Sequence, residues 1–176
     1  MIMNAISPRQ RFSNKPSFGR FTPASKRSAR WAVVLAGGDG TRLQSMTRTI
    51  TGDNRPKQFV PVIGSQTLHD QTRSRVALSV LPSRTMFVVT EKHRRFYESL
   101  TQTVSPNLVL EQPQNKGTAP AILYALMRVA AKSPRAIVAL FPSDHFFADD
   151  EEFMSHVDAA FDAVQKQNPK FELLED

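Results

Sequence analysis

The chain has 176 residues, of which 40% are hydrophobic; it contains no cysteine and carries a formal net charge of +7. This length suits one domain of ordinary size with a core of its own. Without cysteine the chain has no disulfide, no thiolate nucleophile and no zinc–sulfur site, which suits a cytoplasmic protein. No apolar run approaches the ~18 residues that span a membrane, so we expect no membrane partner.

The excess positive charge is confined to the first 30 residues. They hold seven basic residues and no acidic one, so the remaining 16 basic residues balance the 16 acidic residues of the chain. The segment is rich in Ser, Pro, Lys and Arg and has no apolar period, which predicts a disordered basic tail over residues 1–30. It lacks the apolar core of a secretory signal, and Pro8, Pro16 and Pro23 disfavour the amphipathic helix of a transit peptide.

Two further explanations of this tail stay open. One is a nucleic-acid-binding arm, and the other is a start codon placed too early. Loose basic tails more often have no binding role, so nucleic acid is not the expected partner.

After the tail, predicted strands alternate with predicted helices. The first strand is a continuous apolar run that stops at a glycine, which is typical of a strand buried on both faces. In chain order we expect a strand at 31–36, a helix at 66–80, a strand at 85–90, a helix at 92–103, a strand at 107–111, a helix at 119–132, a strand at 136–141, a helix at 151–166 and the start of a fifth strand at 171–174.

This alternation predicts the fold class. Strands separated by helices pair in parallel through right-handed crossovers, which gives a three-layer α/β sandwich with a mostly parallel sheet. In the third helix we expect Thr118 to cap the N-terminus and Pro120 to lie in the first turn. The spacing of Ile122, Leu126 and Val129 predicts the buried face of that helix.

Unusual polar segments follow three of the predicted strands. They are GGDGTR after the first strand, QPQNKGT after the third and PSDH after the fourth. In parallel sheets ligands bind beyond the carboxyl ends of the strands. The convergence of three such segments on one edge therefore predicts a binding site there.

The first of these segments indicates phosphate binding. The dinucleotide fingerprint fails because its last glycine would be Leu43, and the chain has no Gly-Lys-Ser/Thr triplet for a Walker loop. Gly37, Gly38 and Gly40 nevertheless allow a tight turn with bare N–H groups, and Arg42 adds a fork of donors for phosphate oxygens. Taken alone, the segment is more often a plain strand-to-helix turn.

The other segments strengthen the phosphate hypothesis. Lys57 lies in RPKQF between a stiff proline and an apolar residue; such a lysine is otherwise a solvated surface charge. Thr118 follows a glycine at a helix N-terminus, where free N–H groups meet anions or serve only as a cap. Asp144 ends a strand at the ligand edge, where a carboxylate is a natural Mg²⁺ ligand or an ordinary loop hydrogen-bond acceptor.

Four motifs in this order and spacing carry a family resemblance. LAGGDGTRL, RPKQF, NKGTAPAI and FPSDHFF resemble the nucleotidyltransferases that make nucleotide sugars, and most of all the mannose-1-phosphate guanylyltransferases. The similarity runs over residues 31–176. It implies a Rossmann-like, GT-A-like nucleotidyltransferase fold, of which this chain would be the truncated N-terminal portion.

The resemblance also implies a reaction and a site. The family joins GTP to a sugar 1-phosphate, here mannose 1-phosphate, and releases GDP-sugar and pyrophosphate. Arg42 would hold the β- and γ-phosphates, Lys57 the α-phosphate and the sugar phosphate, and Asp144 would bind Mg²⁺. The nucleotide would lie against these residues: Leu35, Ala36, Gly37, Gly38, Gly40, Thr41, Gln112, Asn115, Gly117 and Thr118.

Several features leave alternatives open. The segment 48–54 is longer than in many relatives, and the family domain continues past Asp176 with a sugar pocket and a second metal-binding carboxylate. The chain is therefore either the nucleotide-binding portion of an enzyme or a non-catalytic nucleotide-binding fragment or regulatory homologue. Other bases and sugars and the oligomeric state stay open.

The four histidines also differ in expectation. His145 is either a neighbour that supports Asp144 or an ordinary loop histidine. His69, His93 and His156 are expected on helix surfaces.

Overall fold

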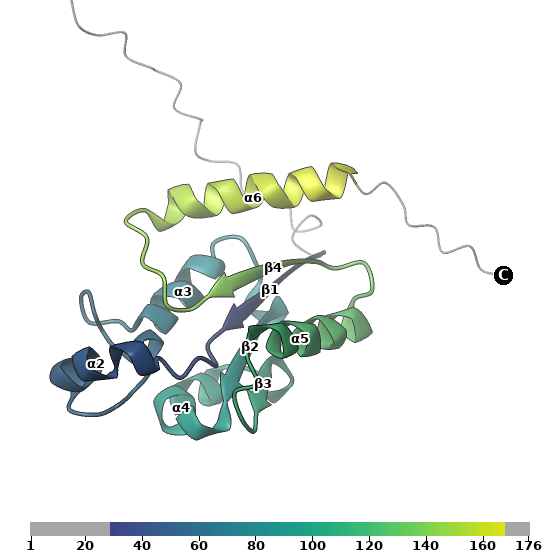
Figure 1. The fold of residues 1–176 in the computed structure, drawn as a ribbon. Helices are drawn as coiled ribbons and strands as arrows, with labels where there is room; N and C mark the ends of the chain where they lie inside the picture. Colours follow the sequence, from purple (N-terminus) through teal and green to yellow (C-terminus); the bar gives the residue numbers. More distant parts are fainter. Residues whose placement is uncertain (1–28, 168–176) are drawn as a thin grey trace, which may run out of the picture.

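The computed structural model describes residues 29–167, which form one sheet with helices on both faces (Figure 1). The strands are β1 (Arg30–Leu35), β2 (Thr85–Thr90), β3 (Val109–Gln112) and β4 (Ile137–Pro142). They lie in the order β3-β2-β1-β4, and every neighbouring pair is parallel. The α/β fold with a parallel sheet that the alternating pattern predicted is thereby confirmed.

The helices of this part of the chain connect and follow the strands. They are α2 (Gln44–Thr51), α3 (Leu68–Val76), α4 (Arg94–Thr103), α5 (Thr118–Lys132) and α6 (Asp150–Gln167). Among the 3-10 turns, η1 (Thr41–Leu43) precedes α2, η2 (Lys57–Phe59) precedes α3 and η4 (Glu91–His93) precedes α4. No helix within residues 29–167 is both long enough and apolar enough to cross a membrane.

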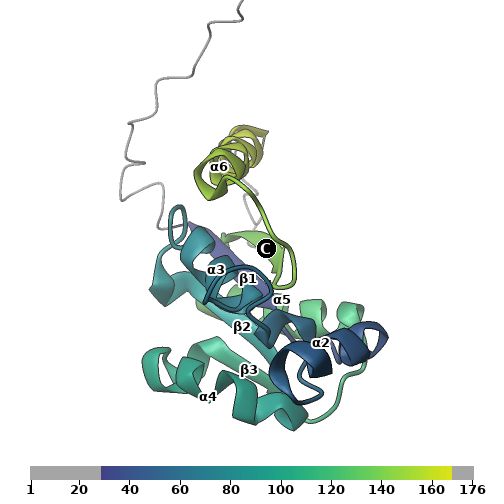
Figure 2. The same cartoon turned by 90° about the vertical axis from the view of Figure 1, so that its left-hand side faces the viewer.

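Two cores lie on opposite faces of the sheet. Side chains alternate along a strand, so Trp31 and Val33 of β1 pack toward α5, while Ala32 and Val34 pack in the cluster that includes residues of α3, α4 and α6. All four are almost fully buried. Figure 2 shows α3 and α4 on one side of the sheet and α5 on the other. A strand covered on both faces needs the continuous apolar sequence that β1 has.

The tail ends earlier than the sequence indicates. Arg30, expected in the basic tail, is the first residue of β1 and is only 2% exposed. Its guanidinium forms ion pairs with Asp158 and Asp162 of α6, which is why a charged residue is tolerated at a buried strand end. The rest of the predicted tail, residues 1–28, and the predicted strand at 171–174 lie outside the described residues.

Element boundaries differ by two residues or more in three places. The helix expected over 92–103 begins at Arg94, because the residues before it form the 3-10 turn η4. The helix expected over 66–80 ends at Val76 because the chain turns there, although Val80 remains buried against the same core. The third strand begins at Val109 because the residues before it form a 3-10 turn that starts at Pro106. Such end effects are not encoded in apolar periodicity.

The buried face of α5 differs from the prediction. Of the expected residues Ile122, Leu126 and Val129, only Val129 is fully buried, and Leu126 is 36% exposed. Ala121 and Ala125 occupy the face toward the sheet instead. The strands already supply large side chains to this core, so small residues let the helix approach closely.

The start of α5 also differs. Thr118 is the first helical residue and makes no capping hydrogen bond, whereas Gly117 is the N-cap with a φ of 92°. Only a residue without Cβ adopts that conformation readily, so glycine rather than the threonine side chain sets the helix start. Pro120 lies in the first turn, as predicted.

Two of the histidines expected on the surface are buried. His69 is 3% exposed and His93 is 4% exposed. Both contact Phe59, at ring-centroid distances of 5.6 Å and 6.5 Å. A helix position does not reveal which face the fold covers, so the surface prediction for these two was wrong. His156 is exposed, as predicted.

Candidate functional site

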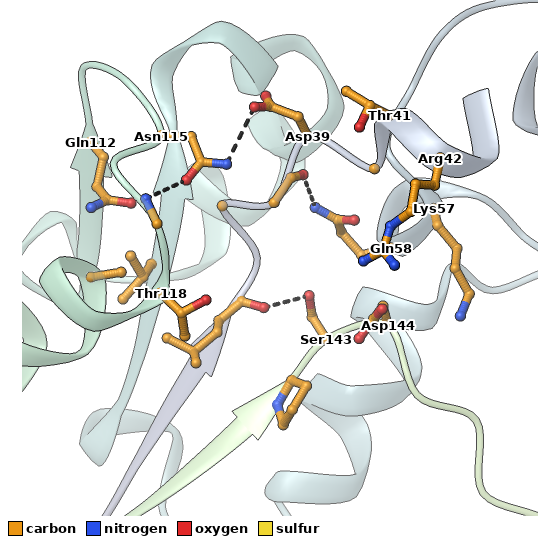
Figure 3. A pocket seen from close by; sticks show the side chains of 18 of the residues that line it. Asp39, Thr41, Arg42, Lys57, Gln58, Gln112, Asn115, Thr118, Ser143 and Asp144 are labelled. Atoms are coloured by element: carbon orange, nitrogen blue, oxygen red, sulfur yellow. Dashed lines mark hydrogen bonds between the residues drawn. The ribbon is translucent and has the colours of Figure 1, made fainter.

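A cleft of about 780 Å³ lies at the carboxyl edge of the sheet (Figure 3). The chain proceeds from β1 to β2 and β3 on one side and then places β4 on the other side of β1. The loops after β1 and β4 therefore diverge, which leaves a crevice where parallel α/β sheets bind ligands. All three polar segments predicted from the sequence contribute to its lining.

The carbonyl groups of the glycine loop are held from within the protein. Nε2 of Gln58 donates to the carbonyl oxygens of Ala36 (3.0 Å) and Gly38 (2.9 Å). Oγ1 of Thr90 donates to the carbonyl oxygen of Gly37 (2.8 Å). Gln58 is only 5% exposed, so its side chain forms a buried support beneath the loop. These bonds fix the direction of the peptide planes between 36 and 39.

The N–H groups of the same loop have no such partners. Within residues 29–167, the backbone N–H groups of Gly37, Gly38, Asp39 and Gly40 donate to no protein acceptor. Occupied carbonyls beside free N–H groups create a positively polarised concavity. The arrangement therefore suits an anion such as phosphate.

Glycine is required at one position of the loop by geometry. Gly40 has a φ of 61°, and an added Cβ would lie 3.2 Å from both N of Lys57 and Cα of Pro56. A side chain here would be strained and would press against the segment that carries Lys57. The loop and the lysine-bearing turn thus pack directly against each other.

Two cations line the cleft near this loop. Arg42 lies in η1 and Lys57 begins η2, directly after Pro56. Neither forms an ion pair with an acidic residue in the described part of the chain. Figure 3 shows both on the opposite side of the glycine loop from Gln112, Asn115 and Thr118. Cations left without a protein counter-ion can bind an anionic ligand.

Polar side chains after β3 form the other wall. Gln112 ends β3, and the N–H of Gly117 at the start of α5 donates to Oδ1 of Asn115 (2.9 Å). Nδ2 of Asn115 donates to Oδ2 of Asp39 (3.2 Å), which links this wall to the glycine loop. Amide groups present both donors and acceptors, which is what recognition of a nucleotide base requires.

The end of β4 carries a carboxylate to the same edge. Oγ of Ser143 donates to the carbonyl oxygen of Leu35 (2.8 Å), and so does its N–H (3.2 Å). Asp144 follows, with its side chain 47% exposed and 3.7 Å from Nε2 of His145. The serine therefore fixes Asp144 beside the end of β1.

The donor set for a metal ion is partial. Asp144 offers the hard oxygen ligand that Mg²⁺ prefers, and Mg²⁺ is commonly held by one or two carboxylates together with substrate phosphates. Within residues 29–167 no group of three or more acidic or histidine side chains surrounds a metal position. Asp144 thus fits a site that the ligand's own phosphates complete.

Most residues predicted from the sequence line this cleft. Ala36 does not, because it is buried under the loop, where its N–H donates to the carbonyl oxygen of Val88 (2.8 Å). Sequence reasoning missed Gln58, Ser143 and Asp39. Gln58 and Ser143 lie within the motifs RPKQF and PSDH, but they act by hydrogen bonds to carbonyl groups far away in the chain. Asp39 could have been found from the sequence, because an acidic residue is unexpected inside an anion-binding loop.

The sheet order, the glycine loop and the free N–H groups define a parallel α/β protein with an anion-binding loop at the carboxyl edge of its sheet. The nucleotidyl transferase family matches residues 31–170, and the chain belongs to that family. The resemblance predicted from the four motifs is thereby confirmed.

Named relatives narrow the comparison. Xanthan biosynthesis protein XanB of Xanthomonas campestris pv. campestris is 32% identical over 136 residues, which is 76% of this chain and 28% of XanB. Mannose-1-phosphate guanylyltransferase of Escherichia coli (strain K12) is 32% identical over 133 residues, 72% of this chain and 26% of that enzyme. The chain therefore spans about a quarter of the length of these relatives.

A solved structure has a similar fold. Mannose-1-phosphate geranyltransferase from Thermus thermophilus superposes with a TM-score of 0.65 at 29% identity. The superposition covers 77% of this chain and 38% of that one. The fold therefore extends over most of the described residues.

Proposed function

We propose that this chain supplies the nucleotide-binding part of a sugar-1-phosphate nucleotidyltransferase that uses GTP and mannose 1-phosphate. The observation that carries the proposal is the glycine loop, whose carbonyl groups are occupied and whose N–H groups have no acceptor within residues 29–167. The relatives named mannose-1-phosphate guanylyltransferase support the choice of substrates.

The proposed reaction needs no protein nucleophile. An oxygen of the sugar phosphate attacks the α-phosphorus of GTP in line, the bond between the α-phosphorus and the bridging oxygen breaks, and pyrophosphate leaves with the electron pair. Catalysis then consists of positioning and charge neutralisation. The two cations of the cleft, Arg42 and Lys57, can supply that charge.

The two cations take different parts of the triphosphate. Arg42 follows the glycine loop directly and neutralises the β- and γ-phosphates, where charge develops as pyrophosphate departs. Lys57 contacts the α-phosphate and the incoming sugar phosphate, which brings two anions together against their repulsion. A bound Mg²⁺ would add charge stabilisation, and Asp144 is the residue that would hold it.

The wall after β3 takes the base and ribose. Gln112 and Asn115 present amide groups, and the first turn of α5, which begins at Thr118 after Gly117, presents the N–H groups of a helix N-terminus. A guanine base offers both acceptors and donors on one edge, which amide side chains match.

The alternative is a non-catalytic nucleotide-binding fragment or regulatory homologue, which would bind a nucleoside triphosphate in the same cleft without joining it to a sugar phosphate. Positioning of two reactants is worth roughly 7–11 kcal/mol, so a protein that binds the nucleotide but does not hold the sugar phosphate in line has little turnover.

Two measurements on the purified 176-residue chain separate these functions. Thermal unfolding with and without millimolar GTP, ATP, CTP or UTP and Mg²⁺ reports binding, since a ligand selective for the folded state raises the Tm. Pyrophosphate release from GTP plus mannose 1-phosphate reports catalysis. Binding with turnover on the order of 1 s⁻¹ supports the enzyme, and binding without turnover supports the fragment. No shift with any nucleotide would refute the proposed site.

A further inference from the structure

One acidic side chain stands inside the loop that is proposed to bind phosphates. Asp39 lies between Gly38 and Gly40, lines the cleft, and has a side chain that is 30% exposed. A carboxylate at that place repels a triphosphate. The proposed chemistry gives it no task, so its contacts must account for it.

Both oxygens of this carboxylate meet side chains from other strand ends. Oδ1 of Asp39 lies 3.2 Å from Nε2 of His93 and 3.6 Å from Nζ of Lys92, in the turn after β2. Oδ2 accepts the hydrogen bond from Nδ2 of Asn115 in the loop after β3 (Figure 3). Asp39 therefore joins the loop after β1 to the next two strand ends.

The link continues to the start of α5. Oδ1 of Asn115 accepts from the N–H of Gly117, so the Asn115 side chain is held at both ends of its amide. Gly117 is the N-cap of α5. A continuous polar connection thus runs from Asp39 to the wall of the cleft that faces the glycine loop.

The partners differ in how firmly they hold the carboxylate. The His93 side chain is 6% exposed and packs beside Phe59, so it provides a fixed point. The Lys92 side chain is 71% exposed, and its contribution is mainly to offset the carboxylate charge. The fixed contacts define position, and the cation reduces the repulsion that a triphosphate would meet.

We propose that Asp39 is a positioning residue that holds the glycine loop at a fixed separation from the start of α5 and so sets the width of the nucleotide cleft. The inference rests on the proposed function, since it concerns the same cleft. The positioning role and mere proximity to phosphates predict opposite changes in ligand affinity. Removing an acid that only lies near the phosphates strengthens the binding of every anion. Removing a positioning residue weakens the binding of ligands that span the cleft.

Two ligands distinguish these cases by calorimetric titration. GTP must contact both the loop and the wall after β3, whereas inorganic tripolyphosphate needs only the loop and the cations. In Asp39→Ala we expect GTP affinity to fall roughly ten- to hundredfold, the range that corresponds to one lost hydrogen bond to a charged group. Tripolyphosphate affinity should stay equal or rise. Glu98→Ala, which removes an exposed acid from α4, should change neither affinity.

The loop itself gives a readout that needs no ligand. Amide hydrogen exchange in segments 37–43 and 115–121, followed at the hydrogen-bonded N–H groups of Leu43 and Gly117, should become faster in Asp39→Ala than in the wild-type chain and in Glu98→Ala. Asp39→Asn, which keeps an oxygen acceptor for Asn115, should show a smaller increase and serves if the alanine variant folds poorly. Unchanged exchange in both segments overturns the positioning role, as does tighter GTP binding by Asp39→Ala.

These readouts separate the inference from the function it rests on. If wild-type protein binds no nucleotide, the proposed function fails, while the exchange experiment still decides whether Asp39 fixes the loop. If wild-type protein binds GTP and the variant binds it equally well, the function stands and the positioning role is overturned.

Discussion

Nη1 of Arg30 lies 2.6 Å from Oδ1 of Asp158, so the first residue of β1 is bound to α6, 128 residues further along the chain. Nη2 of the same guanidinium donates to Asp162 at 3.0 Å, and its carbon lies 4.8 Å above the ring of Phe161. A planar guanidinium can serve two carboxylates at once, which a lysine cannot do as well. Arg30 thus fixes α6 against the sheet.

Substitution of this arginine should lower stability. Arg30→Met keeps much of the side-chain volume but leaves two carboxylates beside a buried position, so we expect a loss of about 1–3 kcal/mol in the free energy of unfolding. Urea denaturation followed by circular dichroism measures it. Arg135→Met, at an exposed position, is the matched control. An unchanged midpoint in Arg30→Met would show that α6 is held by apolar packing alone.

The same contact limits how the basic tail is removed. A deletion of residues 1–28 tests the tail as a nucleic-acid-binding arm, because it should abolish salt-sensitive DNA or RNA binding while leaving GTP binding intact. A deletion that extends through Arg30 should also destabilise the domain. Thermal melting of both deletions shows the difference, and equal Tm values would contradict the structural role of Arg30.

Two glycines of the loop should respond differently to alanine. Gly40→Ala forces a side chain into a left-handed conformation and against Pro56, so stability should fall by about 1–2 kcal/mol. At Gly38 an added Cβ meets no protein atom within 4 Å, so stability should hold while the methyl group enters the cleft. Tm and GTP affinity are measured for both variants. We expect a lower Tm in Gly40→Ala, and weaker GTP binding at an unchanged Tm in Gly38→Ala. Equal effects on Tm would contradict this assignment.

Stability should also depend on pH through His93. Burial lowers the pKa of His93 below its usual 6.5, Asp39 partly opposes this shift, and Lys92 adds to it. As pH falls through 6.5, His93 becomes protonated in the unfolded chain while it stays neutral in the folded chain. The free energy of unfolding therefore falls. His93→Gln should reduce this loss between pH 7.5 and 5.5 in urea titrations. If the free energy of unfolding changes with pH equally in both proteins, His93 is not the source of the pH dependence.

Arg42 should distinguish nucleotides by their phosphates. Arg42→Ala should weaken GTP binding by about 1.5–3 kcal/mol, the range for a hydrogen bond to a charged group, and leave GMP binding unchanged. Arg48→Ala removes an arginine from α2 that bonds Asn54 outside the cleft, so it is the matched control. Equal loss for GTP and GMP would place Arg42 away from the β- and γ-phosphates.

The sequence predicted the sheet and its ligand edge because both depend on local patterns. Continuous apolar runs indicate buried parallel strands, and β2 has the predicted bounds, Thr85–Thr90. Gly37, Arg42 and Asp144 lie at the strand ends, where topology brings them together whatever the packing details. The positions of these residues could therefore be predicted without any knowledge of long-range contacts.

Other features depend on partners far away in the chain. Gln58 bonds carbonyl groups 20 and 22 residues earlier, and no pattern near residue 58 shows this. Arg30 resembles its basic neighbours in composition, and only α6 distinguishes it. In α5 the larger residues Leu123 and Met127 are 61% and 63% exposed, because they lie on the opposite side of the helix from the buried Ala121 and Ala125. Apolar periodicity alone cannot rank alanine above leucine for burial.

The support that Gln58 and Thr90 give to the glycine loop affects the thermodynamics of binding. Ordering a flexible backbone costs about 1–2 kcal/mol per residue, and here that cost falls on folding rather than on ligand capture. The loop is preorganised, so a ligand meets N–H groups already aligned. Substitutions at Gln58 or Thr90 would then weaken affinity with an entropic signature, although neither side chain needs to touch the ligand.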